Sequence, residues 1–391
     1  MPKTHFFMSY KGEIMKKKLL IVLIFLQFFT LFAFDFGGSI GDTFKLRFPS
    51  IDEIQLKNDF STSFWFKSPL DYYGHTNFLM DVLFNINSDF STKKSVINFD
   101  VNQLYINMKI PLSNNFYCNY FMGRTNFSDI TGYVYNEKLD YLSFYFGLNN
   151  FNFSTCFGYS GLLNAKTLNM YYPLTYNTTN KIYAFPNEKF FILDSKLTFN
   201  MKNFFDTLAF EGIMFFSPQI LTGPRFYVNA AVQNQLTNNI TYDINTSFLF
   251  NSTSDGKIAN LTQANFCFPK ENFDLILKAL FTSHNSNSLT SFSPLTATTV
   301  NFFGSPCTDI FQLGGRFYYN LQNKNSFSFD IDAVYQYNEA NKKMLFNGIQ
   351  WVGKVNIYAT SDILINLTLA QNFKNLDESQ FYLDTGLKII Y

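Results

Sequence analysis

The sequence predicts an all-β chain that closes into a transmembrane antiparallel up-and-down β-barrel of about 16–18 strands after a cleaved signal peptide. Three observations predict this fold class. Apolar and polar residues alternate along most of the chain, which gives each strand two different faces. The alternating segments are about 9–12 residues long, close to the length of a tilted strand that crosses a bilayer. Short and long connections also follow each other in turn, as in barrels with tight turns at one end.

Composition excludes two other classes of protein. The chain has 391 residues, of which 47% are hydrophobic, 20% aromatic and only 15% charged. With 51 Phe and 24 Tyr it carries too much apolar surface to remain disordered. A bundle of membrane-spanning helices is excluded because the mean hydropathy is only −0.04. After the N-terminus, moreover, no run of about 18 uncharged apolar residues occurs.

The N-terminus is typical of a secretory signal peptide. Three lysines follow Met15, the stretch Leu19–Phe32 carries no charge, and a small residue, Ala33, precedes the alternating pattern that begins near Asp35. We therefore expect residues 1–34 to be an upstream extension and signal peptide, and residues 35–391 to be the barrel. A retained N-terminal anchor helix is the alternative, although the stretch is short for a membrane span.

The net charge and the cysteine content do not indicate a particular binding partner, cofactor or metal site. Cleavage after residue 34 removes five lysines and one glutamate, which leaves 25 basic and 28 acidic residues. This small negative excess gives no electrostatic reason to expect a nucleic acid as partner. Cofactor-binding motifs are absent, so neither a cofactor nor a metal is predicted. The four cysteines have no metal-binding spacing, and their disulfide pairing cannot be read from the sequence: Cys118, Cys156, Cys267 and Cys307.

The alternation is clearest in Phe327–Tyr337, where every odd residue is apolar and, apart from Val334, the even residues after Phe327 are polar or small. Ile240–Phe250 alternates in the same way on even positions. An AT-rich genome would raise the phenylalanine content everywhere, but it would not place phenylalanine on one parity. Comparable strands are predicted at Phe78–Ile86, Phe151–Tyr159, Phe226–Gln233, Phe273–Phe281, Ile363–Leu369 and Phe381–Tyr391.

The connections fall into two classes that alternate along the chain, as a membrane barrel with short periplasmic turns and longer outer loops requires. Counting strands back from the C-terminus gives about 18, or 16 if two neighbours merge. Short turns are predicted at Pro111–Asn115, Asn149–Asn150, Asn200–Asn203, Asn234–Asn239, Pro269–Asn272, Leu321–Asn325 and Thr360–Asp362. Longer links are predicted at Thr125–Lys138, Gly161–Glu188, Ser217–Pro224, Asn251–Lys257, Ser283–Pro306, Asn338–Lys343 and Asn372–Glu378.

If the apolar positions of each alternating strand face lipid, the positions between them face the interior. These inward positions carry nine acidic and eight basic residues. So many ionisable groups would be very costly in a dry core, so we expect a water-filled lumen without strong ion selectivity. For any single charge, an internal salt bridge is the alternative to a role in a constriction. The candidate pore-lining residues are Lys45, Arg47, Glu211, Arg225, Asp243, Arg316, Asp330 and Asp332.

Two arginines have similar surroundings. Gly223-Pro-Arg225-Phe-Tyr and Gly314-Gly-Arg316-Phe-Tyr each open a predicted strand near a long link. In one hypothesis, Arg225 and Arg316 lie opposite Asp330 and Asp332, and the transverse electric field between these opposite charges orients polar solutes that pass through the lumen. The alternative is convergent strand chemistry, with glycine for the turn and aromatics for the girdle at the lipid boundary.

The C-terminal segment Phe381–Tyr391 is an alternating strand that ends on an aromatic residue. It resembles the C-terminal strand of bacterial outer-membrane β-barrel proteins. This resemblance implies an outer-membrane location, lipid contact and recognition of Tyr391 by the barrel-assembly machinery. The segment Phe34-Asp-Phe-Gly-Gly38 resembles spirochaetal members of that group.

These observations favour a porin-like channel for passive diffusion of small polar solutes. A surface adhesin or loop-displaying barrel is the alternative, because Gly161–Glu188 and Ser283–Pro306 either fold into the mouth or form an outer binding surface. An enzyme is the remote alternative. His284-Asn-Ser286-Asn resembles a stretch of outer-membrane phospholipase A, but the Trp-Asn-Arg that follows in that family is missing here.

Overall fold

The computed structural model describes residues 34–50, 53–113, 115–159, 190–201, 205–217, 224–237, 239–251, 258–283, 295, 309–321, 324–338, 342–374 and 378–391. The signal peptide predicted for residues 1–34 therefore lies, except for Phe34, outside the described residues, as does the His284–Ser286 stretch. Within the described ranges, none of the helices is long and apolar enough to cross a membrane.

The described residues form 18 strands, the upper value of the predicted range. In chain order these are β1 (Asp35–Ser50), β2 (Glu53–Pro69), β3 (Thr76–Asp89), β4 (Lys94–Ser113), β5 (Phe116–Ser128), β6 (Asn136–Leu148), β7 (Phe151–Tyr159), β8 (Phe191–Met201), β9 (Phe205–Phe216), β10 (Arg225–Thr237), β11 (Ile240–Asn251), β12 (Ile258–Pro269), β13 (Phe273–Thr282), β14 (Ile310–Asn320), β15 (Ser326–Asn338), β16 (Lys343–Tyr358), β17 (Ile363–Lys374) and β18 (Glu378–Ile390).

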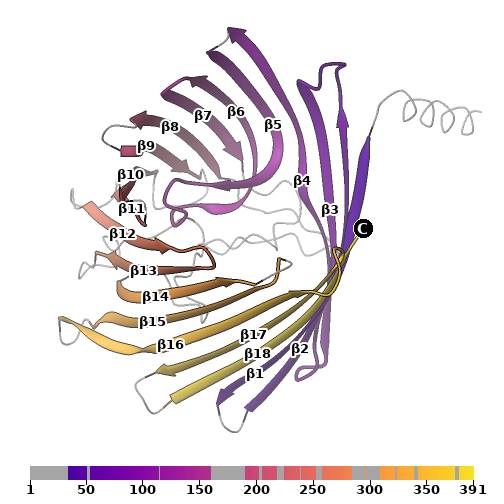
Figure 1. The fold of residues 1–391 in the computed structure, drawn as a ribbon, viewed down its shortest axis with the longest axis vertical. Helices are drawn as coiled ribbons and strands as arrows, with labels where there is room; N and C mark the ends of the chain where they lie inside the picture. The colour runs from indigo at the N-terminus through magenta and orange to yellow at the C-terminus, as the bar shows by residue number, and fades with distance from the viewer. Residues whose placement is uncertain are drawn as a thin grey trace, which may run out of the picture.

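Each strand pairs antiparallel with the strands before and after it in sequence, and β18 returns to pair with β1. Figure 1 shows the strands following one another around the molecule, with the yellow β18 beside the indigo β1. The sheet is therefore a closed up-and-down barrel, which confirms the predicted fold class. Closure pairs the backbone of every strand on both sides and leaves no open edge.

The seam between the first and last strands explains two glycines near the start of the barrel. The amides of Gly38 and Tyr391 exchange hydrogen bonds with each other's carbonyl oxygens, at 2.8 and 3.0 Å. A Cβ atom on Gly37 would lie 2.7 Å from the Trp65 ring, and one on Gly38 would lie 2.7 Å from the Tyr391 hydroxyl. Gly37 leaves space for the Trp65 ring, and Gly38 leaves space for the Tyr391 ring and for the Ser63 carbonyl oxygen, which would lie only 2.4 Å from an added Cβ.

The two ends of the barrel differ as predicted. One end, which we call the terminal end, carries the start of β1, the end of β18 and the short turns such as 149–150 and 270–272. The other, the loop end, carries the connections 160–190 and 283–309 between consecutive strands. Because consecutive strands are antiparallel, every second connection lies at the same end, and the longest connections all lie at the loop end.

Ten of the 18 strands are longer than the predicted length of about 9–12 residues, and some connections are correspondingly shorter, whereas the connections 160–190 and 283–309 are slightly longer than predicted. β4 has 20 residues and β2 has 17, against the expected length of about 9–12 for a tilted spanning strand. The predicted link Thr125–Lys138 shrinks to residues 129–135, because Ser128 still pairs with Asn136 in the β5–β6 ladder. Ladder hydrogen bonds use backbone groups, so polar residues that look like loop in the sequence can continue a strand.

The two faces of the strands separate as the alternation predicts. Phe329 and Ile331 of β15 lie on the outer face and are exposed, whereas Asp330 and Asp332 between them are buried on the inner face. β13 shows the same arrangement, with Leu275, Leu277 and Phe281 exposed outward. The outside of the barrel is thus apolar around its circumference, and the ionised side chains line its interior.

Candidate functional site

The candidate site is the part of the lumen that the β5–β6 connection narrows. This connection, residues 129–135, is called the inward loop below. Its Val134 and Tyr135 are completely buried. They belong to one apolar cluster with inner-face side chains of eight consecutive strands, β8 to β15: Ile192, Ile213, Phe215, Tyr227, Leu249, Ala259, Leu261, Leu280, Ile310 and Val334. The inward loop therefore lies inside the barrel, against the far wall.

One residue of the β13–β14 connection reaches the same place. The Leu295 amide donates a 2.8 Å hydrogen bond to the Val134 carbonyl oxygen, and the Leu295 side chain is fully buried in the apolar cluster. At this residue, the link predicted at Ser283–Pro306 lies within the lumen rather than outside it. Its remaining residues between 284 and 308, like the link Gly161–Glu188, lie outside the described part of the chain.

Asp129 holds the inward loop in its conformation. Its carboxylate accepts hydrogen bonds from the backbone amides of Thr131, Val134 and Tyr135 at 2.8, 3.0 and 2.9 Å, and a close contact from the Thr131 hydroxyl. Gly132 has a φ of 69°, a left-handed conformation that favours glycine in a tight turn. Burial raises the pKa of Asp129, and these hydrogen bonds lower it only in part.

A second carboxylate, from the barrel wall, anchors the loop to β9. The Ile130 amide donates a 3.0 Å hydrogen bond to the Glu211 carboxylate. Asn229 of β10, which is completely buried, bridges the two acids: its side-chain amide donates to Glu211 at 2.7 Å and to Asp129 at 3.3 Å. The buried Glu211 thus serves as an attachment point for the inward loop, a role the sequence pattern did not indicate.

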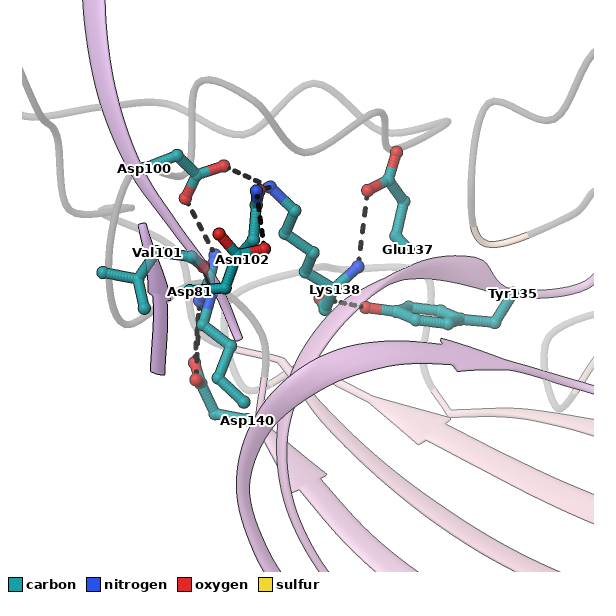
Figure 2. A network of polar contacts seen from close by, with 9 residues as sticks. Asp81, Asp100, Val101, Asn102, Tyr135, Glu137, Lys138 and Asp140 are labelled. Carbon is teal, nitrogen blue, oxygen red and sulfur yellow. Dashed lines mark hydrogen bonds and ion pairs between the residues drawn. The ribbon is translucent and has the colours of Figure 1, made fainter. Parts of the chain in front are cut away.

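The strands that carry the inward loop are braced by a network of buried charges, shown in Figure 2. Arg124 of β5 lies between Asp100 and Asp140, at 3.6 and 3.2 Å, and its Nε donates to the Val101 carbonyl oxygen at 2.8 Å. Lys138 forms an ion pair with Asp100. The side chains of Arg124 and Asp100 are only 3% and 1% exposed, so this network replaces the water that the charges would otherwise need.

The sequence contains a signal for this network, although the alternation pattern alone does not single out Arg124. Gly123-Arg124 repeats the glycine–arginine pattern of Gly315-Arg316. A Cβ on Gly123 would lie 2.2 Å from the Leu104 carbonyl oxygen, and its φ of 138° is one that other residues rarely adopt. Position 123 therefore needs glycine where β5 bends, and the arginine that follows lies inside the barrel.

Polar side chains on the opposite wall lie in one register row that crosses six strands, β11 to β16. Asp243, Asn265, Lys278, Gly314, Asp332 and Gln350 are successive partners in the antiparallel ladders. Lys278 reaches across Gly314 to Asp332 at 3.1 Å and also contacts Asp330 at 3.2 Å. The Arg316 Nε donates a 2.6 Å hydrogen bond to Asp330. Two cations and two carboxylates thus form one compact group.

Gly314 leaves the space through which Lys278 and Asp332 meet. A Cβ at this position would lie 1.9 Å from the Asp332 carboxylate and 2.8 Å from the Ile331 carbonyl oxygen. We predict that Gly314→Ala lowers the free energy of unfolding by about 1–3 kcal/mol, the usual cost of overpacking. Denaturant titration of the folded barrel in detergent tests this.

The neighbouring glycine is the control for this prediction. At Gly315 the nearest atom to an added Cβ is 3.7 Å away, which is ordinary contact. Gly315→Ala should therefore leave stability within about 0.5 kcal/mol of the native value, as surface substitutions usually do. Equal effects of the two substitutions would contradict the packing described for Gly314.

Two cavities lie beneath the inward loop. One, of about 330 Å³, is bounded by Tyr133 of the inward loop and by inner-face side chains of β11 to β14, among them Asp243, Gln263, Lys278 and Gln312. The other, of about 370 Å³, is bounded by Ile130 and by inner-face side chains of β8 to β11, among them Lys196 and again Asp243. The inward loop therefore borders two polar cavities in the lumen that share Asp243.

The other sequence-predicted residues lie elsewhere on the inner wall. Lys45 contacts Asp59, and the Arg47 guanidinium lies over the Tyr382 ring, 5.1 Å from its centre. Arg225 is the first residue of β10 and is buried. Of the two arginines in the transverse-field hypothesis, Arg316 contacts Asp330, whereas Arg225 lies four strands away from β14.

The predicted position of the Gly314-Gly315 pair is corrected by the structure. These glycines lie in the middle of β14 rather than at its opening, and Gly314 is explained by its contact with Asp332 rather than by a turn. Within the described part of the chain, no group of three or more histidine, cysteine, aspartate or glutamate side chains is arranged to hold a metal ion.

A closed 18-stranded antiparallel barrel with apolar outer and polar inner faces is the architecture of known channel proteins, and solved structures share it. Neither a protein-family model nor a curated protein sequence matches the chain. OccK1 (OpdK) of Pseudomonas aeruginosa is similar in structure, with a TM-score of 0.58, 8% identity and coverage of 91% of this chain and 98% of that one.

Two further solved structures are similar to this chain over most of its length. OccK2 (OpdF) of Pseudomonas aeruginosa, solved in complex with glucuronate, gives a TM-score of 0.56 at 9% identity and covers 91% of this chain and 97% of its own. OccAB4 of Acinetobacter baumannii gives 0.54 at 8% identity, with coverage of 92% and 98%. At such low identities the likeness establishes the fold, over nearly the whole length of both chains.

Proposed function

We propose that this chain is a bacterial outer-membrane channel through which small polar solutes diffuse passively. The observation that carries the proposal is the combination of an exposed apolar outer face with an interior lined by ionised side chains and polar cavities. In a membrane, the outer face would contact lipid, while the inner charges would remain hydrated in the lumen. A barrel of this strand number is wide enough for an aqueous channel.

Two features of the sequence support the location. The stretch from Met15 to Ala33 is typical of a cleaved export signal. The strand that ends at Tyr391 resembles the segment by which the assembly machinery recognises outer-membrane barrels, and Tyr391 lies in the seam that closes this barrel. A spirochaetal type remains a proposal based on Phe34–Gly38, where the two glycines also have the packing role described above.

The inward loop supports selective passage rather than open diffusion. It fills part of the lumen and borders cavities of about 330 and 370 Å³, the volume of a small organic solute. OpdK was solved with vanillate and OccK2 with glucuronate, so barrels of this fold do bind small polar molecules. We propose that the eight residues predicted from the sequence belong to the wall of the pore, with Asp243 and Arg316 bordering these cavities directly and Glu211 holding the inward loop against that wall: Lys45, Arg47, Glu211, Arg225, Asp243, Arg316, Asp330 and Asp332.

Liposome swelling with uncharged solutes of graded size tests this function. The mature chain, folded into liposomes, should admit glycerol and a pentose and should largely exclude a trisaccharide, because the spaces beside the inward loop are small. A heat-dependent shift in gel mobility confirms beforehand that the barrel has folded. Liposomes with folded barrel that swell no faster than empty ones in glycerol would contradict the proposal.

A further inference from the structure

Asp243 carries a charge that the barrel wall does not neutralise. Its carboxylate accepts a 2.8 Å hydrogen bond from the Asn265 side chain and a longer one, 3.5 Å, from Asn245. Both donors are neutral amides, and in the described ranges of the chain no lysine or arginine forms an ion pair with Asp243. The carboxylate borders both cavities beneath the inward loop. Asp243 is thus held in place by its neighbours while its negative charge faces the route of a solute.

Lys278 and Arg316, the two cations that border this cavity, are each already paired with aspartate carboxylates. Lys278 is shared by Asp330 and Asp332, at 3.2 and 3.1 Å, and the Arg316 Nε binds Asp330 at 2.6 Å. Asp330 and Asp332 are buried in the wall beside Lys278 and Arg316 and do not border the cavity themselves, but their two negative charges balance the two cations. Asp243, which does border the cavity, then adds one negative charge. Because Coulomb energies are larger in a narrow, partly desolvated lumen, a net negative cavity favours cations over anions.

A second acceptor faces the same cavity. Gln312 of β14 is only 4% exposed and borders the cavity of about 330 Å³. Its Oε1 atom has no hydrogen-bond partner among the described residues. Buried polar atoms in native proteins are nearly always paired, so this carbonyl oxygen is available to a donor that enters the cavity. Gln312 and Asp243 lie three strands apart, about 14 Å between backbones at the usual strand spacing.

We propose that this cavity binds an elongated solute with an ammonium group at Asp243 and a second hydrogen-bond donor at Gln312. The inference rests on the proposed channel function and adds the class of solute to it. Tyr133 of the inward loop borders the cavity, and an aromatic ring in such a position adds a favourable surface for a cation. The site thus combines a charged acceptor, a neutral acceptor and an aromatic side chain.

Two kinds of solute with an ammonium group fit this site, and they differ in whether they also use Arg316. Its side chain is 49% exposed, so the guanidinium nitrogens other than Nε can meet a carboxylate in the lumen. A diamine would use only the acceptors Asp243 and Gln312, whereas an amino acid with a basic side chain would use Arg316 as well. Both solutes require Asp243, and a dicarboxylate does not.

Block of the single-channel current tests the inference with three probes of similar length: 1,5-diaminopentane, lysine and glutarate. We expect diaminopentane and lysine to interrupt the current at lower concentrations than glutarate. Asp243→Asn should raise the half-blocking concentration of diaminopentane on the order of tenfold, as expected for a lost hydrogen bond to a charged group. Gln312→Met should raise it several-fold, since it removes a neutral acceptor while keeping the volume.

Asp384→Asn is the matched control. Asp384 is also an inward aspartate, but it lies on β18, seven strands from β11 and within the electrostatic influence of Lys45 and Arg47. Block by diaminopentane should be unchanged in this variant. Tighter block by lysine than by diaminopentane, lost in Arg316→Met, would support the inference and assign the solute to the amino acids.

The outcomes separate this inference from the proposed function. A barrel that conducts but is blocked best by glutarate, or whose block by diaminopentane is the same with Asp243→Asn, contradicts the ammonium site alone. A folded barrel that carries no current contradicts the channel function and, with it, the site.

Discussion

Asp129→Ala is expected to raise the single-channel conductance, because it releases the inward loop from the lumen. Four donors of the loop itself lose their acceptor: the amides of Thr131, Val134 and Tyr135 and the Thr131 hydroxyl. Each donor left buried and unpaired costs about 1–3 kcal/mol. The loop therefore gains more by unfolding into the aqueous lumen than by staying docked. Conductance in a planar bilayer measures the result.

The control for this variant is an aspartate with the same local role at the terminal end. The Asp71 carboxylate accepts a 3.0 Å hydrogen bond from the His75 amide and a close one from the Thr76 amide in the turn between β2 and β3. Asp71→Ala also removes a turn acceptor, but far from the lumen, and should leave the conductance unchanged. If Asp129→Ala folds and conducts like the native chain, the inward loop does not limit the current.

Arg124→Met is expected to destabilise the barrel by about 3–5 kcal/mol, the usual cost of removing one partner from a buried ion pair. The substitution leaves Asp140 and one side of Asp100 without the guanidinium that lies 3.2 and 3.6 Å from them. Methionine keeps an apolar stem similar to that of arginine, so the effect comes mainly from the lost guanidinium group. Denaturant titration in detergent measures the loss of stability.

An exposed ion pair provides the comparison. Lys57 lies 3.5 Å from Asp89, with side chains 36% and 24% exposed. Surface pairs of this kind contribute about 0–1 kcal/mol, so Lys57→Met should change the stability by no more than that. Similar losses in the two variants would mean that the Arg124 network does not act as a buried structural unit.

The fold was predictable from the sequence because its cause is local. Alternation along Phe327–Tyr337 directly reports which side chains face outward, and the structure places Phe329 outward and Asp330 inward as expected. The order of short and long connections follows from hairpin geometry and sets the barrel topology. The exact strand ends were not predictable, because polar residues such as Ser128 and Asn136 continue the ladder through their backbones.

The site was less predictable because its contacts are distant in sequence. Glu211 binds the amide of Ile130, 81 residues earlier, and Asn229 contacts Asp129 across 100 residues. Such partners follow from the curvature of the closed barrel, which no local pattern records. The sequence did identify Asp243, Arg316, Asp330 and Asp332 as inward, but counting charges suggested a nearly neutral lumen. The pairing of Lys278 with two aspartates, seen only in the structure, leaves Asp243 uncompensated.

The most direct test of this account is the single-channel current of the folded mature chain in a planar bilayer. A water-filled lumen should give steady, ohmic current steps that scale with salt concentration, and the steps should be larger when Asp129→Ala releases the inward loop. A barrel whose folding is confirmed by its heat-dependent gel shift, yet which carries no current in either form, would contradict the central claim that the lumen is a solute path.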